Sequence, residues 1–423
     1  MNRPDRFSKT CQVSNERKSI MKIGILREGK RPPDKRVPFS PEQCTQITER
    51  FPVVEIFVQP SKIRCFSDDE YRKAGVFLQE DLSKCDVLMG VKEVPVQDLI
   101  PGKTYFFFSH TIKKQSHNRK LLQEVVRKKI RLIDYEMLTG KDHMRIIGFG
   151  RFAGLVGVYN GLLSFGKRNH LFEFKPAYQC SDLQELKNKV AGLQLPPIKI
   201  AVTGGGRVAG GAIEMLREIP VRQVSVEEYL GHDLFDEPVF VQLNPGDYNL
   251  HKGNKPFDLL HFFNHPSEYK GNFGRFCNQT DLLIGAAYWD PKAPVLFTAE
   301  EMKKPDFRIR VIADISCDIE GSIPSTKIAG TIANPVYDYN PETGELENAY
   351  SSEKNVTVMA VDNLPCALPK DASVDFGNNL ISKVLPHLLG DDKEDVIKRA
   401  TIAENGNLTA QFTYLSDYIT EEK

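Results

Sequence analysis

A glycine-rich segment at residues 198–216, IKIAVTGGGRVAGGAIEML, has the residue types and spacing of a phosphate-binding turn. The pattern Gly204-x-Gly206-x-x-Ala209 lies between a β-branched run and apolar residues at helical spacing, which predicts a strand, a turn and a helix. Glycine lets the backbone approach a pyrophosphate, and the free N–H groups at the start of the helix bind its negative charge. The segment therefore predicts dinucleotide binding. The residues expected to contact the dinucleotide are Gly204, Gly205, Gly206, Arg207, Val208 and Ala209.

The choice between NADH and NADPH depends on the strand expected at residues 223–226. In such a fold this strand usually ends in an acid that binds the adenosine ribose. Ser225 occupies that place and is assigned to the cofactor site, while Glu227 follows slightly later. Arg207 and Arg222 are close in sequence and would suit the 2′-phosphate of NADPH. We therefore expect NAD(P)H, with NADPH favoured and NADH left open by Glu227.

Cationic and titratable residues follow several predicted strands in the first 150 residues of the chain. They are Arg27, Arg36, Lys92, His110 and Lys113. Ligands of open α/β sheets bind at the carboxyl ends of the strands, so these side chains are expected to converge from separate loops. Arginine offers a bidentate fork for a carboxylate and lysine a movable charge. Any one of them alone could be a solvated loop charge, but the set predicts a site for a ligand with several carboxylates.

Two acidic residues stand where a further core strand, predicted at residues 310–315, comes to its end. They are Asp314 and Asp318. Because the carboxyl ends of parallel strands share one edge of the sheet, we expect both carboxylates to face the nicotinamide end of a bound dinucleotide.

Two sequence patterns, the spacing of histidines and the spacing of cysteines, bear on whether the chain binds a metal. His261 and His265 stand four residues apart, a spacing that can place two ligands on one helix face. The glutamate of an HEXXH motif is absent, however, and Pro266 ends any helix there. The eight cysteines are scattered without a CxxC pair, which favours free thiols. We therefore predict no metal.

Strands and helices must alternate along most of the chain to position these residues. From Met21 onward, short apolar runs alternate with segments of helical spacing, which predicts parallel sheets covered on both faces. The predicted fold class is α/β, with two doubly wound, Rossmann-like domains and a cleft between them. Residues 21–150 plus 360–423 are expected to form the substrate domain, and residues 151–359 the dinucleotide-binding domain. A glycine-rich helix at residues 148–166 should let another element approach closely.

Composition and charge argue against several classes of protein. The 423 residues include 56 basic and 56 acidic ones, which gives no electrostatic signature of nucleic-acid or membrane-surface binding. No apolar run approaches the length of a transmembrane helix. Residues 1–20 are polar and basic, so a disordered tail is expected, with the functional start at Met1 or Met21. We interpret the chain as a cytoplasmic protein, a monomer or homo-oligomer, whose partners are small molecules.

Six stretches resemble one enzyme family. They are FSHTIKKQ at residues 108–115, IRLIDYE at 130–136, GFGRFAGLVG at 148–157, VTGGGRVAGGA at 202–212, ISCDIEGSI at 315–323 and VDNLPCALPKDAS at 361–373. The chain resembles the L-lysine-forming saccharopine dehydrogenases, and still more the lysine–ketoglutarate reductase half of the bifunctional aminoadipic semialdehyde synthase. The layout is shared with alanine dehydrogenase and the transhydrogenase nucleotide domain.

The resemblance implies roles for individual residues. His110 matches the acid–base histidine of the family, and Lys92 matches the lysine beside it. The positions that hold substrate carboxylates match Arg27, Arg36, Lys113 and Arg145. The pyrophosphate loop of the family matches the glycine-rich turn.

The implied reaction joins L-lysine to 2-oxoglutarate and reduces the imine to saccharopine with NAD(P)H. Lys113 and Arg145 argue for more carboxylates than the pyruvate of an alanine dehydrogenase offers. His110 and Lys92 argue against a non-catalytic nucleotide sensor of the same fold. A saccharopine-cleaving, glutamate-forming enzyme belongs to a different sequence family.

Overall fold

The computed structural model describes residues 20–29, 33–232 and 234–420. The tail predicted at residues 1–20 lies outside this description except for its last residue. The seven cysteines in the described ranges are free thiols, as predicted. None of the helices in these ranges is both long enough and apolar enough to cross a membrane.

The described residues form two compact units. The first unit comprises residues 20–29, 38–137 and 397–420, and the second comprises residues 33–37 and 138–396 without residue 233. These units differ from the predicted boundaries at three places. Residues 33–37, 138–150 and 360–396 belong to the second unit, whereas they are predicted in the first.

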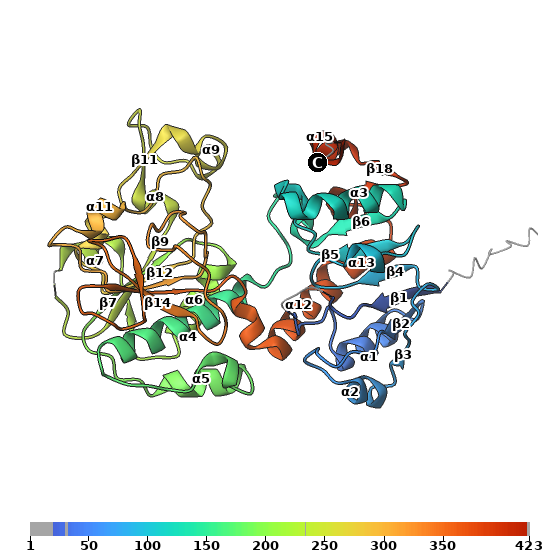
Figure 1. The fold of residues 1–423 in the computed structure, drawn as a ribbon, viewed down its shortest axis with the longest axis horizontal. Coiled ribbons are helices and arrows are strands. Elements are labelled where there is room, and N and C mark those ends of the chain that lie inside the picture. Colours follow the sequence, from blue (N-terminus) through green and yellow to red (C-terminus); the bar gives the residue numbers. More distant parts are fainter. Residues whose placement is uncertain (1–19, 30–32, 233, 421–423) are drawn as a thin grey trace, which may run out of the picture. The chain divides into compact units, whose positions relative to one another are not determined.

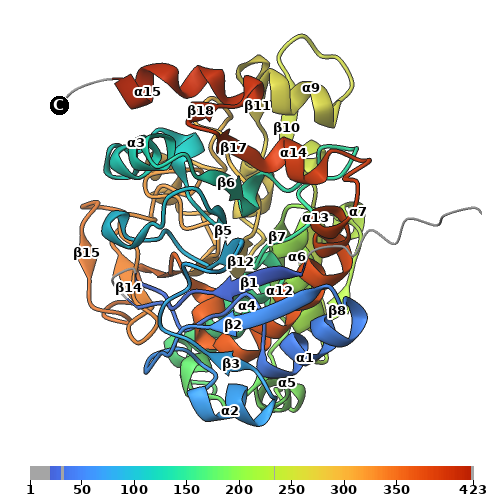
Figure 2. The ribbon, with the colours of Figure 1, turned by 90° about the vertical axis from the view of Figure 1, so that its right-hand side faces the viewer.

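The first unit is built on one mixed sheet. In the described part of the chain its strands follow the order β18-β17-β6-β5-β4-β1-β2-β3. Figure 2 labels these strands except β4, which is labelled in Figure 1. The strands are β1 (Met21–Ile25), β2 (Val54–Val58), β3 (Phe77–Leu78), β4 (Val87–Met89), β5 (Thr104–Phe107), β6 (Arg131–Asp134), β17 (Thr401–Glu404) and β18 (Asn407–Leu408). Strands β1 to β6 pair in parallel, as predicted, whereas β17 and β18 add an antiparallel edge beside β6.

Local sequence signals set the helices of the first unit. Ser40 followed by Pro41 predicts a helix start in the sequence, and helix α1 (Pro41–Arg50) begins there. The Ser40 Oγ accepts the N–H of Gln43, and the Gln43 side chain accepts the N–H of Ser40. Helix α2 (Asp68–Lys73) begins with the same capping box. Helix α3 (Arg119–Arg127) buries one apolar face, as its spacing predicts.

The second unit has a second mixed sheet, whose strands in the described residues follow the order β15-β14-β16-β13-β12-β7-β9-β8. They are β7 (Lys199–Thr203), β8 (Arg222–Gln223), β9 (Val239–Leu243), β12 (Leu282–Gly285), β13 (Val311–Asp314), β14 (Val336–Tyr339), β15 (Leu346–Glu347) and β16 (Val356–Ala360). Strand β7 pairs in parallel with β9 and β12, and the antiparallel pairings among these strands are those of β14 with β15 and with β16. Two apolar clusters lie on this sheet, and one of them includes α4 (Gly150–Arg168) and α6 (Arg207–Leu216).

Helices α4 and α6 lie side by side in the second unit (Figure 1). Helix α4 is the glycine-rich helix predicted at residues 148–166. A Cβ on Gly154 would lie 2.1 Å from the carbonyl oxygen of Val208, and a Cβ on Gly211 would lie 2.0 Å from that of Arg151. The two backbones are therefore in direct contact, which only glycine allows at these positions.

A small hairpin and several short helices complete the second unit. The hairpin pairs β10 (Asn249–His251) with β11 (Tyr269–Gly271), and α9 (Leu259–Asn264) lies between them in sequence. The other helices in this unit are α5 (Leu183–Ala191), α7 (Val226–Gly231), α8 (Pro245–Tyr248), α10 (Gly274–Cys277), α11 (Ala299–Met302), α12 (Pro369–Lys383) and α13 (Leu385–Leu389).

Three expected elements differ from the structure. The strand expected at residues 223–226 is shorter and ends at Gln223, because Ser225 already caps α7. The sequence after the prolines Pro365 and Pro369 predicts a helix at residues 378–388. The helix instead begins at Pro369, since proline is favoured in a first helical turn, and it breaks before Pro386. Residues 391–423 are predicted to be a helix and a tail. In the described part of this region the structure has α14 (Val396–Ala400), strands β17 and β18, and α15 (Ser416–Thr420).

Candidate active site

The three glycines join β7 directly to α6, so the predicted strand, turn and helix are confirmed. Gly204 has a φ of 97°, and its N–H donates to the carbonyl of Leu243 at 2.7 Å. A Cβ on Gly204 would also lie 3.0 Å from the Cα of Ala287. The turn needs glycine there for both reasons. Gly206 caps α6 without a side chain, so the first N–H groups of the helix point toward the space above the turn.

Two arginines stand beside this turn. Arg207 is the first residue of α6, and its Nη1 lies 3.3 Å from the position that a Cβ on Gly148 would take. The Cδ of Arg145 lies 3.8 Å from the same position. Burial lowers the pKa of Arg207, and the positive charge of Arg145 lowers it further. Two like charges beside a helix N-terminus favour an anion.

The order of the strands in the second sheet changes which residue is expected to bind the adenosine ribose. The prediction for Ser225 assumed that the strand after α6 pairs with β7, but β9 takes that place and β8 lies at the sheet edge. The Oγ of Ser225 instead accepts the N–H of Glu228 at 3.1 Å. Arg222 is bound at the same edge by Glu228 and Glu237. Neither Ser225 nor Arg222 is therefore placed next to the glycine-rich turn.

Asn244, which the sequence analysis missed, occupies the position that follows β9. Its Oδ1 lies 2.8 Å from the place that a Cβ on Gly205 would take. The N–H of Asn244 donates to Oδ2 of Asp247 at 2.7 Å, in the capping box of α8. The apolar run at residues 239–243 is the signal that could have identified this strand.

Asp314 was expected to face the nicotinamide end of a bound dinucleotide, but its carboxylate is bonded inside the protein. It is buried, and its Oδ1 accepts the N–H and Oγ of Ser316 at 3.1 and 2.6 Å. Its Oδ2 accepts the hydroxyl of Thr326 at 2.6 Å. Burial raises the pKa of Asp314, while these hydrogen bonds act in the opposite direction. Asp314 thus fixes the turn after β13, and Asp318 lies half-buried in that turn.

A cavity of about 430 Å³ lies at the carboxyl ends of β7, β12 and β13. Thr203, Gly285 and Ser316 line it from these strand ends. Aromatic side chains form much of the rest of its wall, namely Tyr248, Phe262, Phe263, Tyr288 and Trp289. A largely apolar cavity at the carboxyl edge of a parallel sheet is where α/β folds bind ligands.

In the first unit, the strand-end residues after β4 and β5 meet. The Nδ1 of His110 lies 2.5 Å from Oε1 of Glu93, and their side chains are only 21% and 11% exposed. A carboxylate at Nδ1 keeps a proton on that nitrogen, so Nε2 is the atom that exchanges protons. In the sequence Glu93 is simply the residue after Lys92, and no local signal marks it as the partner of His110.

The backbone around His110 is held in an unusual conformation. His110 has a φ of 54°, in the left-handed region that few non-glycine residues occupy. Ser109 is tied down by Asp134, whose Oδ2 accepts both the N–H and the hydroxyl of Ser109. The imidazole stacks on Phe108, with ring centroids 6.4 Å apart. These contacts fix the imidazole at the end of β5.

Protonation of Asp134 should make the free energy of unfolding depend on pH. Burial raises the pKa of Asp134 to about 6, although hydrogen bonds from Ser109 and Glu136 act against it. An unfolded aspartate titrates near pH 4, so the folded state binds this proton more tightly. The free energy of unfolding should therefore fall from about pH 4 to about pH 6, and Asp134→Asn should remove that part of the slope. Urea unfolding of both proteins measures it, and equal slopes would contradict the assignment.

Lys92 lies in the same loop as Glu93. The N–H groups of Val91 and Lys92 donate to the carboxylate of Glu28 at 2.6 and 2.9 Å. Glu28 thereby ties the loop after β4 to the loop after β1. Strands β4 and β5 are neighbours, so Lys92, Glu93 and His110 lie at one edge of the first sheet.

Two of the predicted carboxylate-binding cations also belong to the first unit. Arg27 is exposed, and its guanidinium binds the carboxylate of Glu80. The Nζ of Lys113 lies 3.5 Å from Oε1 of Glu136, and the lysine side chain is half-exposed. A substrate carboxylate would compete with these acidic partners.

The other two predicted carboxylate-binding cations, Arg36 and Arg145, belong to the second unit. All four were predicted in one domain, but the structure divides them between two units. Arg145 stands beside Arg207, as described above. Arg36 is buried, where its Nε and Nη2 donate to Asp34 at 3.0 and 2.6 Å and its guanidinium lies 4.0 Å from the ring centre of Phe149. We interpret Arg36 as part of a structural ion pair.

Two family models match the chain. Residues 24–156 match the N-terminal domain, and residues 183–413 the C-terminal domain, of alanine dehydrogenase/PNT. The chain belongs to the alanine dehydrogenase/PNT family. The glycine-rich turn of the second unit, between β7 and α6, lies within the range that matches the C-terminal domain of that family.

Relatives within this family bear out the resemblance seen in the sequence. Alpha-aminoadipic semialdehyde synthase of Arabidopsis thaliana is 29% identical over 93% of this chain and 41% of its own length. The mitochondrial enzyme of that name from Bos taurus is 28% identical over 97% and 49%. The chain therefore spans less than half the length of these two synthases. Saccharopine dehydrogenase [NAD(+), L-lysine-forming] of Emericella nidulans is 24% identical over 85% of this chain and 90% of that protein.

Solved structures of the family agree on the fold. L-alanine dehydrogenase has a TM-score of 0.62 at 15% identity, over 95% of this chain and 100% of that one. The transhydrogenase of Sinorhizobium meliloti has a TM-score of 0.55 at 15% identity, over 92% and 98%. They confirm two α/β domains with mostly parallel sheets.

Proposed function

We propose that this family member catalyses the NAD(P)H-dependent condensation of L-lysine with 2-oxoglutarate to saccharopine, and the reverse reaction. The contact of His110 with Glu93 at the end of two parallel strands carries the proposal, since it supplies an oriented acid–base group. The names of the synthases and of the saccharopine dehydrogenase that the chain resembles support this choice of substrates.

His110 has two proton transfers to perform. The ε-amine of lysine must lose a proton before it attacks the keto carbon, and the carbinolamine oxygen must gain one before it leaves as water. A neutral imidazole accepts the first proton at Nε2 and the resulting imidazolium donates the second. Glu93 keeps Nδ1 protonated and stabilises the imidazolium. Lys92, on the same loop, is proposed to relay protons or to disfavour the charged imidazole.

The glycine-rich turn is proposed to hold the pyrophosphate of the nicotinamide cofactor, which supplies the hydride when bound. Arg207 and Arg145 would neutralise its phosphates, since the two cations stand together at the start of α6. The aromatic cavity beside the turn would exclude water from the cofactor. Arg27 and Lys113 remain proposals for the substrate carboxylates.

We expect Asn244 to set the choice between NADH and NADPH. An acid at this position would bind the ribose hydroxyls and repel a 2′-phosphate, whereas a guanidinium would bind the phosphate. Asn244→Asp should shift the ratio of kcat/KM toward NADH by about tenfold, and Asn244→Arg toward NADPH by a similar factor, the effect of one charge-assisted hydrogen bond. Steady-state kinetics with both cofactors measure the ratio.

Ser225 offers a matched control for this prediction. Ser225→Asp and Ser225→Arg introduce the same charges at the edge of the sheet, after β8, and should leave the cofactor ratio unchanged. A switch produced by the Ser225 variants, with none from the Asn244 variants, would return the ribose position to the strand that follows α6.

One kinetic panel tests the proposed function. Oxidation of NADPH and of NADH is followed at the absorbance of the reduced nicotinamide with lysine plus 2-oxoglutarate, and separately with pyruvate plus ammonia. The proposal requires turnover with the first pair. Turnover with pyruvate and ammonia alone would instead identify an alanine dehydrogenase, and turnover with neither would favour a protein that retains the fold without this chemistry.

A further inference from the structure

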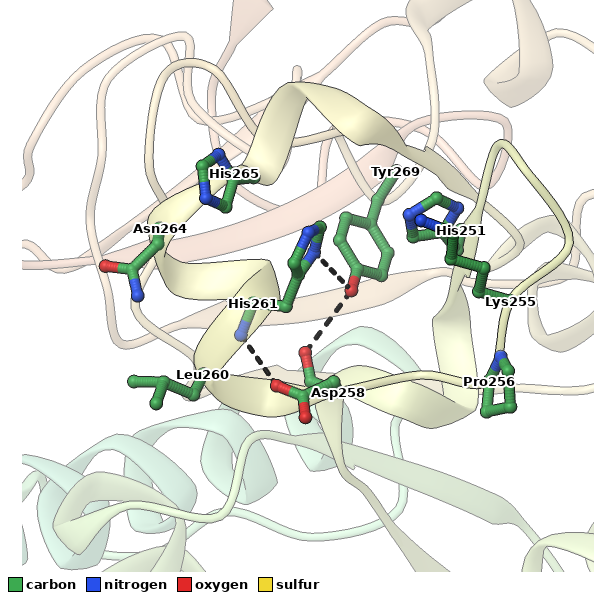
Figure 3. A pocket seen from close by; sticks show the side chains of 9 residues that line it. All are labelled: His251, Lys255, Pro256, Asp258, Leu260, His261, Asn264, His265 and Tyr269. Carbon is green, nitrogen blue, oxygen red and sulfur yellow. Dashed lines mark hydrogen bonds between the residues drawn. The ribbon is translucent and has the colours of Figure 1, made fainter.

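Two histidines and a glutamate gather outside the residues assigned to dinucleotide binding, where the β10–β11 hairpin meets α9. His251 ends β10, His261 lies on α9, and Glu268 lies in the turn before β11. One ligand atom from each lies within 4.8 Å of the others. Figure 3 shows the two imidazoles on either side of Tyr269, along a pocket of about 390 Å³.

The distances are close to those of a metal site. The Nε2 atoms of His251 and His261 lie 3.6 and 3.8 Å from Oε2 of Glu268. Ligand atoms about 2.0–2.1 Å from a tetrahedral zinc ion lie roughly 3.3–3.4 Å from one another. Shifts of the side chains by up to about 1.5 Å would therefore bring all three atoms to bonding distance.

Tyr269 orients His261 for such a role. The hydroxyl of Tyr269 donates to the carbonyl of Asp258 at 3.3 Å, and Nδ1 of His261 lies 3.1 Å from the same hydroxyl oxygen (Figure 3). Because the hydroxyl proton is used on Asp258, Nδ1 of His261 is the donor in this contact, and Nε2 keeps its lone pair. A hydrogen bond from the distal nitrogen is what orients most metal-binding histidines.

His251 supplies a second, independent observation. It is only 8% exposed, and its Nε2 is buried without a hydrogen-bond partner among the described residues. Its Nδ1 accepts the N–H of Gly253 at 2.8 Å, so metal binding at Nε2 must open this bond as the ring proton moves to Nδ1. Gly253 lies in an exposed turn, where its N–H can bond to water instead. We expect that exchange to lower the metal affinity by only about tenfold.

We propose that His251, His261 and Glu268 bind a divalent transition-metal ion of the zinc class, with water at the fourth position. Two imidazoles and a carboxylate are ligands that zinc takes readily. The expectation of no metal rested on the pair His261 and His265 and on the missing HEXXH glutamate. The proposed site instead takes its other two ligands from the end of β10 and from the turn before β11, and it does not depend on the proposed function.

The ion would join the hairpin to α9 and so act on the neighbouring cavity. His261 lines the pocket of about 390 Å³ between α9 and the hairpin. The next two residues on α9, Phe262 and Phe263, line the cavity of about 430 Å³ at the carboxyl ends of β7, β12 and β13. Fixing α9 therefore fixes part of the wall of that cavity. Trp289 lines the same cavity and is the single tryptophan of the chain, so its fluorescence reports on this wall.

Titration of the full chain with Zn²⁺ and Co²⁺, in a buffer that does not chelate, tests the site. We expect one ion per chain by calorimetry, a change in Trp289 fluorescence, and a higher midpoint of thermal unfolding. His261→Gln and Glu268→Gln should each weaken binding by about 10²-fold. Glu268 is about half-exposed, so its variant keeps the test valid if His261→Gln fails to fold.

His117→Gln is the matched control, because His117 is an exposed histidine of the first unit and should leave metal binding unchanged. The proposal is overturned if wild-type protein binds neither ion below about 0.1 mM, far above the range of structural zinc sites. It is equally overturned if both ligand variants bind as tightly as the wild type, or if His110→Gln abolishes binding.

Discussion

Replacement of His110 by glutamine is expected to lower kcat by about 10²- to 10⁴-fold in both directions, the usual contribution of a positioned acid–base group. Glutamine keeps a polar side chain of similar length, so binding of substrate and cofactor should change little. The loss should therefore appear in kcat rather than in KM. Initial rates at saturating lysine, 2-oxoglutarate and reduced cofactor measure it.

Glu93→Gln separates positioning from proton transfer. The amide can still bond to Nδ1 of His110, but it cannot stabilise the imidazolium, so we expect a smaller loss, about 10- to 100-fold. His117→Gln is the control and should retain wild-type rates. Full activity of His110→Gln would remove this residue from the mechanism.

The second large effect concerns the contact between α4 and α6. Gly154→Ala and Gly211→Ala should each lower the free energy of unfolding of the second unit by roughly 3 kcal/mol or more, because overpacking against a rigid backbone is costly. The added methyl carbons would lie 2.1 and 2.0 Å from carbonyl oxygens of the facing helix. No side-chain rotation can relieve such contacts, so the two helices must separate.

Gly210 provides the control, one residue before Gly211 in the same helix. A Cβ on Gly210 meets nothing within 4 Å, so Gly210→Ala should be neutral or should stabilise the protein by about 0.5–1 kcal/mol through helix propensity. Urea unfolding of the three variants, followed by circular dichroism, measures the order. Equal stability of Gly210→Ala and Gly211→Ala would show that the helices do not pack as described.

Elements with strong local signals were predictable from the sequence. The helix start after Ser40, the apolar strands β7 and β13 and the glycine-rich turn all lie where expected, because each depends on residues close together in the sequence. The hairpin of β17 and β18 also carries a local signal, Asn405-Gly406, with φ of 52° and 83°. It was missed because it follows a helix near the end of the chain.

The order of strands was not predictable in the same way. Whether β8 or β9 lies beside β7 depends on packing between segments that are distant in sequence. Both segments are extended, so either strand could pair with β7. The assignment of Ser225 depended on this order and changed with it, which is why Asn244 was not found.

The sequence likewise identifies some residues of the candidate site but not the contacts between them. His110 and Lys92 were found because residue type and position at strand ends are visible in the sequence. The pairing of His110 with Glu93, the ion pair of Arg36 with Asp34 and the internal hydrogen bonds of Asp314 depend on side-chain direction and burial. Spacing alone does not reveal these properties.

The antiparallel edge of the first sheet has a consequence for biosynthesis. Strand β6 receives its second neighbour only when residues 401–408 have left the ribosome, whereas every strand of the second sheet has been made by residue 360. The second unit can therefore complete its core first during translation, while one edge of the earlier sheet stays open. An open edge of this kind, with the apolar Leu132 and Ile133, can pair with another chain until β17 has been made.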